Sequence, residues 1–181
     1  EPGSPAFRKG GYCTQLNPRA TFAAMVYRLD VYVGQLVQKL KDKGIYDNTI
    51  IIFASDNGPH REGGADPDFF NSNGIWRGYK RDLYEGGIRV PMIISWPGHI
   101  QAGTETNFMC SFWDLMPTFE ELLNPKAAVK EMDGVSMLPL LENRKGQKEH
   151  EYLYFEFQEL NGRQAVRKGS WKLVHMNIRG E

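Results

Sequence analysis

Two short polar segments carry residue types that could do chemistry. The first, Asp56-Asn57-Gly58, follows the apolar residues 50–54 after a single serine. A carboxylate and an amide oxygen side by side are hard ligands suited to Ca²⁺ or Mg²⁺, and a following glycine permits a sharp backbone turn. The alternative is that Asp56 caps a turn whose positive-φ geometry comes from Asn57 and Gly58. The three residues by themselves leave metal binding and turn formation both open.

The second segment, residues 76–91, is rich in cations and glycines and leads into another apolar run. Its cations are Arg77, Lys80, Arg81 and Arg89. These side chains could converge on an anionic group, and a lysine ammonium beside a bound oxyanion would neutralise charge that develops on a departing oxygen. The alternative is a solvated loop in which the arginines pair with Asp82 and Glu85.

Several other polar residues are weaker candidates. His60 follows Asp56-Asn57-Gly58-Pro59 closely enough to contact a substrate, although a loop histidine is usually just solvated. Arg81 could read an acidic sugar, and Arg77 and Glu85 are expected to brace the loop. The acidic residues Glu62, Asp66 and Asp68 could hold another cation, but we expect them to form a solvated loop. The histidines His99, His150 and His175 are expected to have ordinary structural roles.

The elements that must position these residues can be predicted from hydrophobic periodicity. Apolar residues recur at steps of three and four over residues 18–43, which predicts an amphipathic helix with Asn17 as N-cap and Gly44 as its exit. Residues 49–55 and 90–96 are continuously apolar, as in strands buried on both faces. Helix followed by buried strand predicts an α/β fold with a parallel sheet, whose ligands bind at the carboxyl ends of the strands, where Asp56 lies.

The second part of the chain changes character. Residues 114–123 are predicted to form a short helix with Asp114 as its cap. After the polar stretch 142–148, alternating residues and the pair Asn161-Gly162 predict a small antiparallel meander. We therefore expect an α/β part over residues 1–148 and a small antiparallel subdomain over residues 149–181.

Composition excludes several classes of function. Lys+Arg and Asp+Glu number 22 each, so zero net charge gives no electrostatic case for a nucleic-acid or anionic-membrane partner. The longest apolar run is far shorter than the ~20 residues that span a bilayer. Cys13 and Cys110 allow one disulfide at most and leave the compartment open. The first residue is Glu1 rather than Met, which suggests a processed or truncated chain.

Taken together, these segments resemble a known family. Residues 52–59, then Arg77-Gly78-Tyr79-Lys80 and residues 83–91, closely resemble the C-terminal half of type I sulfatases in the alkaline phosphatase superfamily. Asp133–Ser136 and residues 163–173 are similar to later parts of the same family. The resemblance implies an alkaline phosphatase-like, mostly parallel sheet flanked by helices and followed by a small C-terminal antiparallel sheet. It also implies a periplasmic or secreted protein.

The resemblance also assigns roles. Asp56 and Asn57 would be two ligands of a calcium ion, with magnesium as the alternative, and Lys80 would contact the oxygens of a sulfate ester. The nucleophile of such enzymes is a formylglycine, made from a Cys or Ser in a motif that continues with any residue, Pro or Ala, any residue, and Arg. Neither Cys13 nor Cys110 is followed by that pattern.

The expected protein is therefore the C-terminal part of a sulfatase, inactive by itself, whose nucleophile comes from a missing N-terminal part. Its substrate would be a sulfated small molecule or glycan, with sulfated carbohydrate favoured. A hydrophobic strand edge left without neighbours would require a companion chain or a dimer. Two alternatives stay open: a phosphate or phosphonate monoester hydrolase of the same superfamily, and a noncatalytic fragment or binding module.

Overall fold

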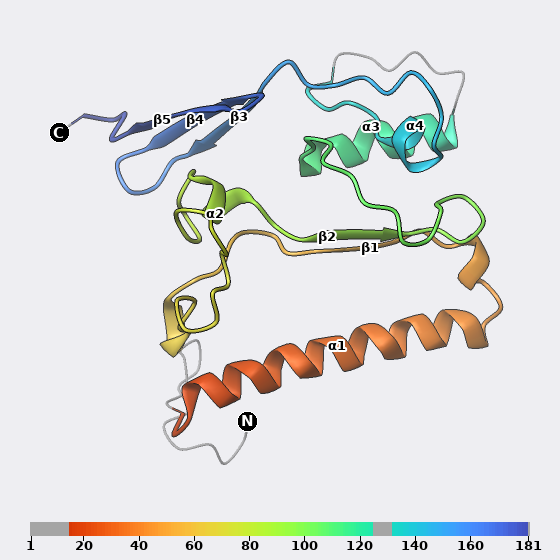
Figure 1. Ribbon diagram of the computed structural model, residues 1–181, viewed down its shortest axis with the longest axis horizontal. Helices are drawn as coiled ribbons and strands as arrows, with labels where there is room; N and C mark the ends of the chain where they lie inside the picture. The colour runs from red at the N-terminus through yellow and green to blue at the C-terminus, as the bar shows by residue number, and fades with distance from the viewer. Residues whose placement is uncertain (1–14, 125–131, 181) are drawn as a thin grey trace. The chain divides into compact units, whose positions relative to one another are not determined.

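The computed structural model describes residues 15–124 and 132–180 (Figure 1). The chain forms two compact units. The first contains the long helix α1 and Phe53–Ile93, and the second contains Asp47–Ile52 and Ile94–Glu181. The boundary between them passes through strands β1 (Ile51–Ala54) and β2 (Met92–Ser95).

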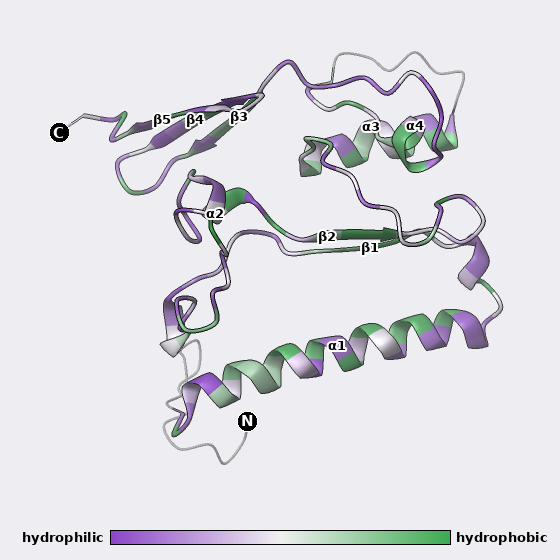
Figure 2. Cartoon of the chain, viewed as in Figure 1, coloured by the Kyte–Doolittle hydropathy of each residue, from purple (hydrophilic) through white to green (hydrophobic). Residues whose placement is uncertain are grey.

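Helix α1 (Pro18–Asp42) confirms the predicted amphipathic helix. It begins with the proline in its first turn, although Asn17 makes no side-chain capping bond, and it exits through Gly44 at φ 67°. None of its residues is buried, and large apolar side chains such as Met25 and Leu36 are 66% and 67% exposed. Apolar and polar residues alternate along the helix in Figure 2. Among the described residues, no helix has the length and apolar character needed to cross a membrane.

The pairing of β1 and β2 corrects the predicted parallel sheet. The two strands pair with each other in a two-stranded sheet and run antiparallel (Figure 1). No parallel sheet occurs within residues 15–124 and 132–180. A continuous apolar run indicates a strand with little contact to water on either face, but it contains no information about the direction of the partner strand. The prediction of two strands was confirmed, and the prediction of their direction was wrong. The predicted burial on both faces was also wrong, because the residues of β1 are only half-buried and Ile93 of β2 is 64% exposed.

Short helical turns connect the strands. In the first unit they are the 3₁₀ turn η2 (Glu62–Gly64) and the short helix α2 (Glu85–Ile88), and in the second unit the 3₁₀ turn η1 (Tyr46–Asn48) precedes β1. After β2, the 3₁₀ turn η3 (Phe112–Asp114) continues into α3 (Leu115–Leu123), and α4 (Leu138–Leu141) follows. Met137 and Leu138 at the start of α4 are 2% and 5% exposed, so a small apolar core lies at α4.

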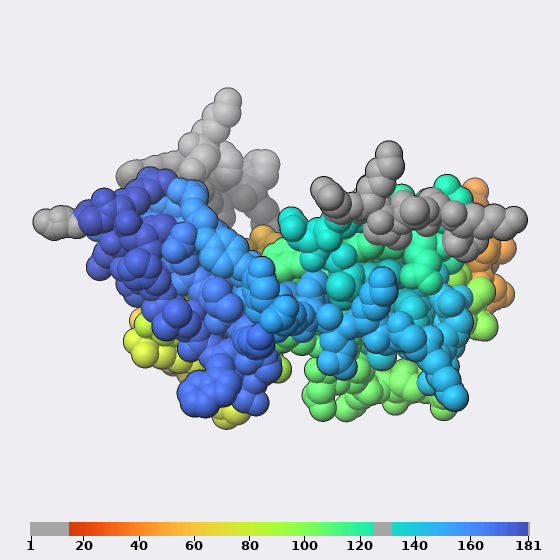
Figure 3. Space-filling model, turned by 90° about the horizontal axis from the view of Figure 1, so that it is seen from above, coloured from red at the N-terminus to blue at the C-terminus, as the bar shows by residue number. Residues whose placement is uncertain are grey.

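The C-terminal strands confirm the predicted meander. β3 (Leu153–Phe157), β4 (Arg163–Lys168) and β5 (Trp171–Met176) form an antiparallel sheet in that order. Asn161 and Gly162 both have positive φ, as expected from the Asn-Gly signal in the first hairpin. One face of the sheet is buried at Leu153 and Ala165, while the edge strand β5, among the dark-blue atoms of Figure 3, exposes alternate side chains.

Candidate active site

The candidate site begins where β1 ends. Ser55 Oγ donates a hydrogen bond to the carbonyl of Asn57 at 2.9 Å, and this contact turns the chain sharply after the strand. The Asp56 side chain is exposed and Asn57 is half-buried. Two hard oxygen ligands are therefore available at the strand end, one of them in contact with solvent.

Backbone hydrogen bonds attach this turn to the cation-rich loop. The Gly58 amide donates to the carbonyl of Gly87 at 2.8 Å, and the Lys80 amide donates to the carbonyl of Pro59 at 2.8 Å. Lys80 therefore lies beside the segment that begins at Asp56. The structure brings together two parts of the chain that the sequence separates by more than twenty residues.

Glycines make this close approach possible. A Cβ on Gly58 would lie 1.9 Å from the carbonyl oxygen of Gly86, and a Cβ on Gly87 would lie 2.1 Å from that of Asp82. Real side chains do not tolerate such distances to backbone atoms, so any larger residue would push the segments apart. Gly86 and Gly87 are also buried within α2. The glycines thus allow the segment after Asp56 and the segment that carries Lys80 to pack closely.

The Glu62 carboxylate forms ion pairs with both cations of the turn, Lys80 and Arg81. Glu62 Oε2 lies 3.6 Å from Lys80 Nζ, and Glu62 Oε1 lies 2.5 Å from Arg81. All three side chains are partly exposed, at 30% to 39%. His60 lies next to this group and accepts a hydrogen bond from the Glu62 amide through Nδ1 at 3.1 Å. The predicted substrate-binding residues Lys80, Arg81 and His60 therefore share one neighbour, Glu62. The sequence alone predicts only a solvated loop for this residue.

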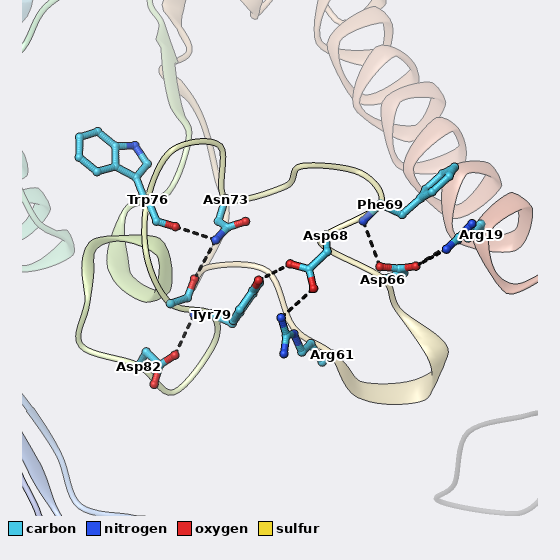
Figure 4. A network of polar contacts seen from close by, with 10 residues as sticks. Arg19, Arg61, Asp66, Asp68, Phe69, Asn73, Trp76, Tyr79 and Asp82 are labelled. Carbon is cyan, nitrogen blue, oxygen red and sulfur yellow. Dashed lines mark hydrogen bonds and ion pairs between the residues drawn. The ribbon is translucent and has the colours of Figure 1, made fainter.

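The other acidic residues of the loop also pair with cations (Figure 4). Asp66 accepts from the Phe69 amide at 3.0 Å and forms an ion pair with Arg19 of α1 at 2.7 Å. The Phe69 amide first, and Arg19 second, lower the pKa of Asp66 below its ordinary value. This carboxylate consequently adds stability above its unfolded pKa, and that stability is lost as the pH falls through the lowered value.

Asp68 completes the loop network. It forms an ion pair with Arg61 at 2.8 Å and accepts a short hydrogen bond from the Tyr79 hydroxyl, as Figure 4 shows. The interaction of Arg61 itself with Tyr79, more than the nearby charge of Asp68, raises the pKa of Arg61 above its ordinary value. In residues 15–124 and 132–180, no three His, Cys, Asp or Glu side chains gather closely enough to hold a metal ion. Asp66 and Asp68 therefore brace the loop through their ion pairs with Arg19 and Arg61.

The remaining cations of residues 76–91 stack on aromatic rings. The guanidinium of Arg77 lies 4.0 Å from the ring centre of Tyr84, and that of Arg89 lies 4.1 Å from the ring centre of Trp76. Arg89 also approaches Glu85 at 3.8 Å. Arg77 and Glu85 thus contact neighbours within their own loop, as expected for residues that brace it.

A second polar cluster, in the other unit, was missed by the sequence argument. Asp114 is fully buried and accepts hydrogen bonds from the Ser111 and Val135 amides at 2.8 Å each. His150 Nε2 lies 2.8 Å from the same carboxylate, with only 6% of its side chain exposed. Sequence placed Asp114 as a cap of α3, and nothing in the sequence linked it to His150. The expected structural role of His150 is consistent with this contact.

Comparison with known proteins identifies the family. The family model described as Sulfatase matches residues 4–125, and the model described as N-sulphoglucosamine sulphohydrolase, C-terminal, matches residues 74–180. The chain belongs to the sulfatase family. Human steryl-sulfatase is 37% identical over 132 residues, which cover 71% of this chain and 23% of that protein. Human arylsulfatase A is 34% identical over 160 residues, covering 85% and 30%.

Several solved structures share the fold. The structure of Ps i-CgsB in complex with k-i-k-neocarrahexaose superposes with a TM-score of 0.75 at 35% identity, covering 90% of this chain and 35% of the other. BT4656 in complex with its substrate D-glucosamine-2-N,6-O-disulfate gives 0.68 at 27% identity, covering 86% and 31%. The phosphonate monoester hydrolase of Agrobacterium radiobacter gives 0.65 at 25% identity, covering 88% and 33%. The chain therefore spans a quarter to a third of the length of sulfatases and relatives that it matches.

Of the two cysteines, only Cys110 lies among the described residues. Cys13 lies outside the described residues. Cys110 is a free thiol in the second unit, and burial first and the nearby Asp114 second raise its pKa. A raised pKa leaves little thiolate near neutral pH, so Cys110 is a poor nucleophile.

Proposed function

We propose that the complete protein hydrolyses sulfate esters, and that this chain supplies the Lys80, Asp56 and Asn57 side chains to the reaction. The observation that supports the proposal is the backbone hydrogen bond between Lys80 and Pro59, since it joins the cationic turn to the segment that starts at Asp56. The chain covers only 23% and 30% of its two human relatives, so the activity is proposed for a protein that includes the rest of the family fold.

In this proposal Lys80 is the catalytic cation. Its ammonium donates hydrogen bonds to the sulfate ester oxygens and balances the negative charge that grows as the ester bond breaks. His60, beside Glu62, contacts the substrate from the neighbouring segment. We place the nucleophile, a formylglycine in the family, in residues outside this chain. Neither cysteine here lies in the required motif, and the one serine that fits it is Ser4, in Ser4-Pro5-Ala6-Phe7-Arg8.

Asp56 and Asn57 fit part of a calcium site. Their carboxylate and amide oxygens are the hard ligands that Ca²⁺ prefers, with Mg²⁺ as the alternative, but Ca²⁺ takes six to eight oxygens. Among the described residues, no three His, Cys, Asp or Glu side chains form a metal-binding group. The remaining calcium ligands would therefore come from outside these residues. When bound, such an ion supplies positive charge beside a sulfate oxygen.

The proposed substrate is a sulfated carbohydrate, and the proposed location is the periplasm or the exterior of the cell. The structures of Ps i-CgsB and BT4656, both in complex with carbohydrates, support this substrate class. A second candidate, phosphonate or phosphate monoester hydrolysis, is favoured by the likeness to the Agrobacterium radiobacter hydrolase. For the chain by itself, we propose a noncatalytic fragment.

The experiment that tests the proposal compares matched esters. We expect the full-length protein to cleave 4-nitrophenyl sulfate with a kcat/KM at least about 100-fold above that for 4-nitrophenyl phosphate, because a site built around one oxyanion discriminates by differential transition-state binding. The isolated chain, assayed in parallel, should bind calcium weakly in a calorimetric titration and should turn over neither ester. A preference for the phosphate would replace the proposal by its rival, and turnover by the isolated chain would refute an external nucleophile.

A further inference from the structure

The turn that carries Lys80 has an unusual residue at its third position. The Asp82 amide donates to the Tyr79 carbonyl at 2.8 Å, which closes a four-residue turn with Lys80 and Arg81 at its centre. Arg81 has φ 76°, in the left-handed region where glycine and asparagine are favoured. An arginine therefore stands where a smaller residue would fit the backbone without strain. Strained backbone at a candidate site points to a role for the side chain it carries.

The Arg81 side chain is directed to the same carboxylate as Lys80. Its guanidinium lies 2.5 Å from Glu62 Oε1, while the Lys80 ammonium lies 3.6 Å from Glu62 Oε2. The two cationic groups thus approach opposite oxygens of one side chain. Both lie at the surface, with 39% and 34% of their side chains exposed, and both are within reach of a ligand from solvent.

Glu62 shows what chemistry this pair of cations accepts. A guanidinium presents its donors in a planar fork that matches a carboxylate or a sulfate, whereas an ammonium acts as a compact point charge. Ion pairs between partly exposed side chains are weak, so a ligand anion can replace the Glu62 carboxylate at small cost. The internal carboxylate therefore occupies the place that an anionic group of a ligand would take.

We propose that Arg81 determines specificity by binding a second anionic group of the substrate, a carboxylate or a further sulfate, next to the sulfate ester held by Lys80. The inference rests on the proposed function, because it takes the Lys80 side as the position of the ester. It goes further in the substrate class: a sugar with two negative groups on neighbouring positions. On binding, the guanidinium exchanges Glu62 for the second substrate anion.

The test uses the full-length protein and substrate pairs that differ in one group. The first pair is a ring-sulfated 4-nitrophenyl glucuronide and the glucoside with the same sulfate, and the second is a disulfated glucoside and its monosulfated counterpart. We expect the wild-type protein to prefer the doubly anionic member of one pair, which shows whether the second group is a carboxylate or a sulfate. In Arg81→Gly the ratio of the two kcat/KM values should fall by about 10- to 100-fold, as expected for a lost charge-assisted contact.

Arg81→Gly suits this test because glycine adopts the observed φ without strain. Arg81→Asn, which also tolerates positive φ, removes the charge by a second route, and Arg81→Lys should retain part of the preference. A ratio that stays within threefold of the wild-type value in both neutral variants would overturn the inference while leaving sulfate ester hydrolysis intact. A wild-type protein without preference in either pair would overturn it as well. Failure to release sulfate from any substrate would instead reject the proposed function.

Discussion

Replacement of Lys80 by alanine is expected to lower kcat/KM for a sulfate ester by about 100- to 1,000-fold in the full-length protein. A single donor aimed at developing oxyanion charge contributes a factor of this size. The loss should appear mainly in kcat, because the interaction strengthens as the ester bond breaks. The assay is the steady-state release of 4-nitrophenol from 4-nitrophenyl sulfate.

The Lys80→Ala variant should fold normally. The ion pair that the substitution removes, between Lys80 and Glu62, is partly exposed and contributes at most about 1 kcal/mol to the free energy of unfolding. Lys168→Ala is the matched control, because Lys168 is an exposed lysine that pairs with Glu151 in the C-terminal sheet. We expect this control to retain wild-type turnover. Activity of Lys80→Ala within threefold of the control would remove Lys80 from the reaction.

The second large effect concerns stability rather than catalysis. Asp114→Ala is expected to lower the free energy of unfolding by about 3–5 kcal/mol, the cost of breaking a buried polar pair by removing one partner. Asp114 is fully buried, and its loss would leave the Ser111 and Val135 amides and His150 without their acceptor. The measurement is the urea midpoint of the full-length protein, followed by circular dichroism.

Asp133 offers a matched comparison for the Asp114 experiment. It is an exposed aspartate in the same unit, and Asp133→Ala should change the free energy of unfolding by no more than about 0.5 kcal/mol. Asp114→Asn, which keeps one acceptor oxygen, should fall between the two. If Asp114→Ala and Asp133→Ala unfolded at the same urea concentration, the buried carboxylate would not hold this part of the fold together.

Local sequence signals predicted most of the elements. The periodicity of residues 18–43 predicted α1 because a single helical face repeats every 3.6 residues whatever the rest of the chain does. The Asn161-Gly162 pair predicted the first hairpin of the C-terminal sheet because two positive φ values are a local requirement. Where a few neighbouring residues decide the backbone, the sequence suffices.

The direction of β2 beside β1 could not be predicted in this way. It depends on how the connection folds back, and two continuous apolar runs are equally suited to either direction. The contact between Asp114 and His150 could not be predicted for a similar reason, since the two residues are 36 positions apart in the sequence. The pairing of Glu62 with Lys80 and Arg81 could not be predicted either, because it depends on the backbone contacts of Gly58 and Pro59 with distant residues. Long-range contacts of this kind become visible only in three dimensions.

The exposed apolar residues of α1 bear on the expected companion. Met25, Leu29 and Leu36 are each at least half exposed, although the periodic pattern predicts that such residues face a core. Since the chain spans 23% and 30% of its human relatives, the remaining part of the family fold is the proposed cover for this face. A dimer is the alternative, and sedimentation of the chain by itself distinguishes the two.

The most direct measurement of the central claim is a crystal structure of the full-length protein grown with CaCl₂ and a slowly cleaved aryl sulfate, with the metal located by its anomalous signal. We expect one Ca²⁺ bound by oxygens of Asp56 and Asn57, and a sulfate group that contacts this ion and lies at hydrogen-bond distance from Lys80 Nζ. A sulfate bound elsewhere, or a calcium ion that neither Asp56 nor Asn57 touches, would contradict it.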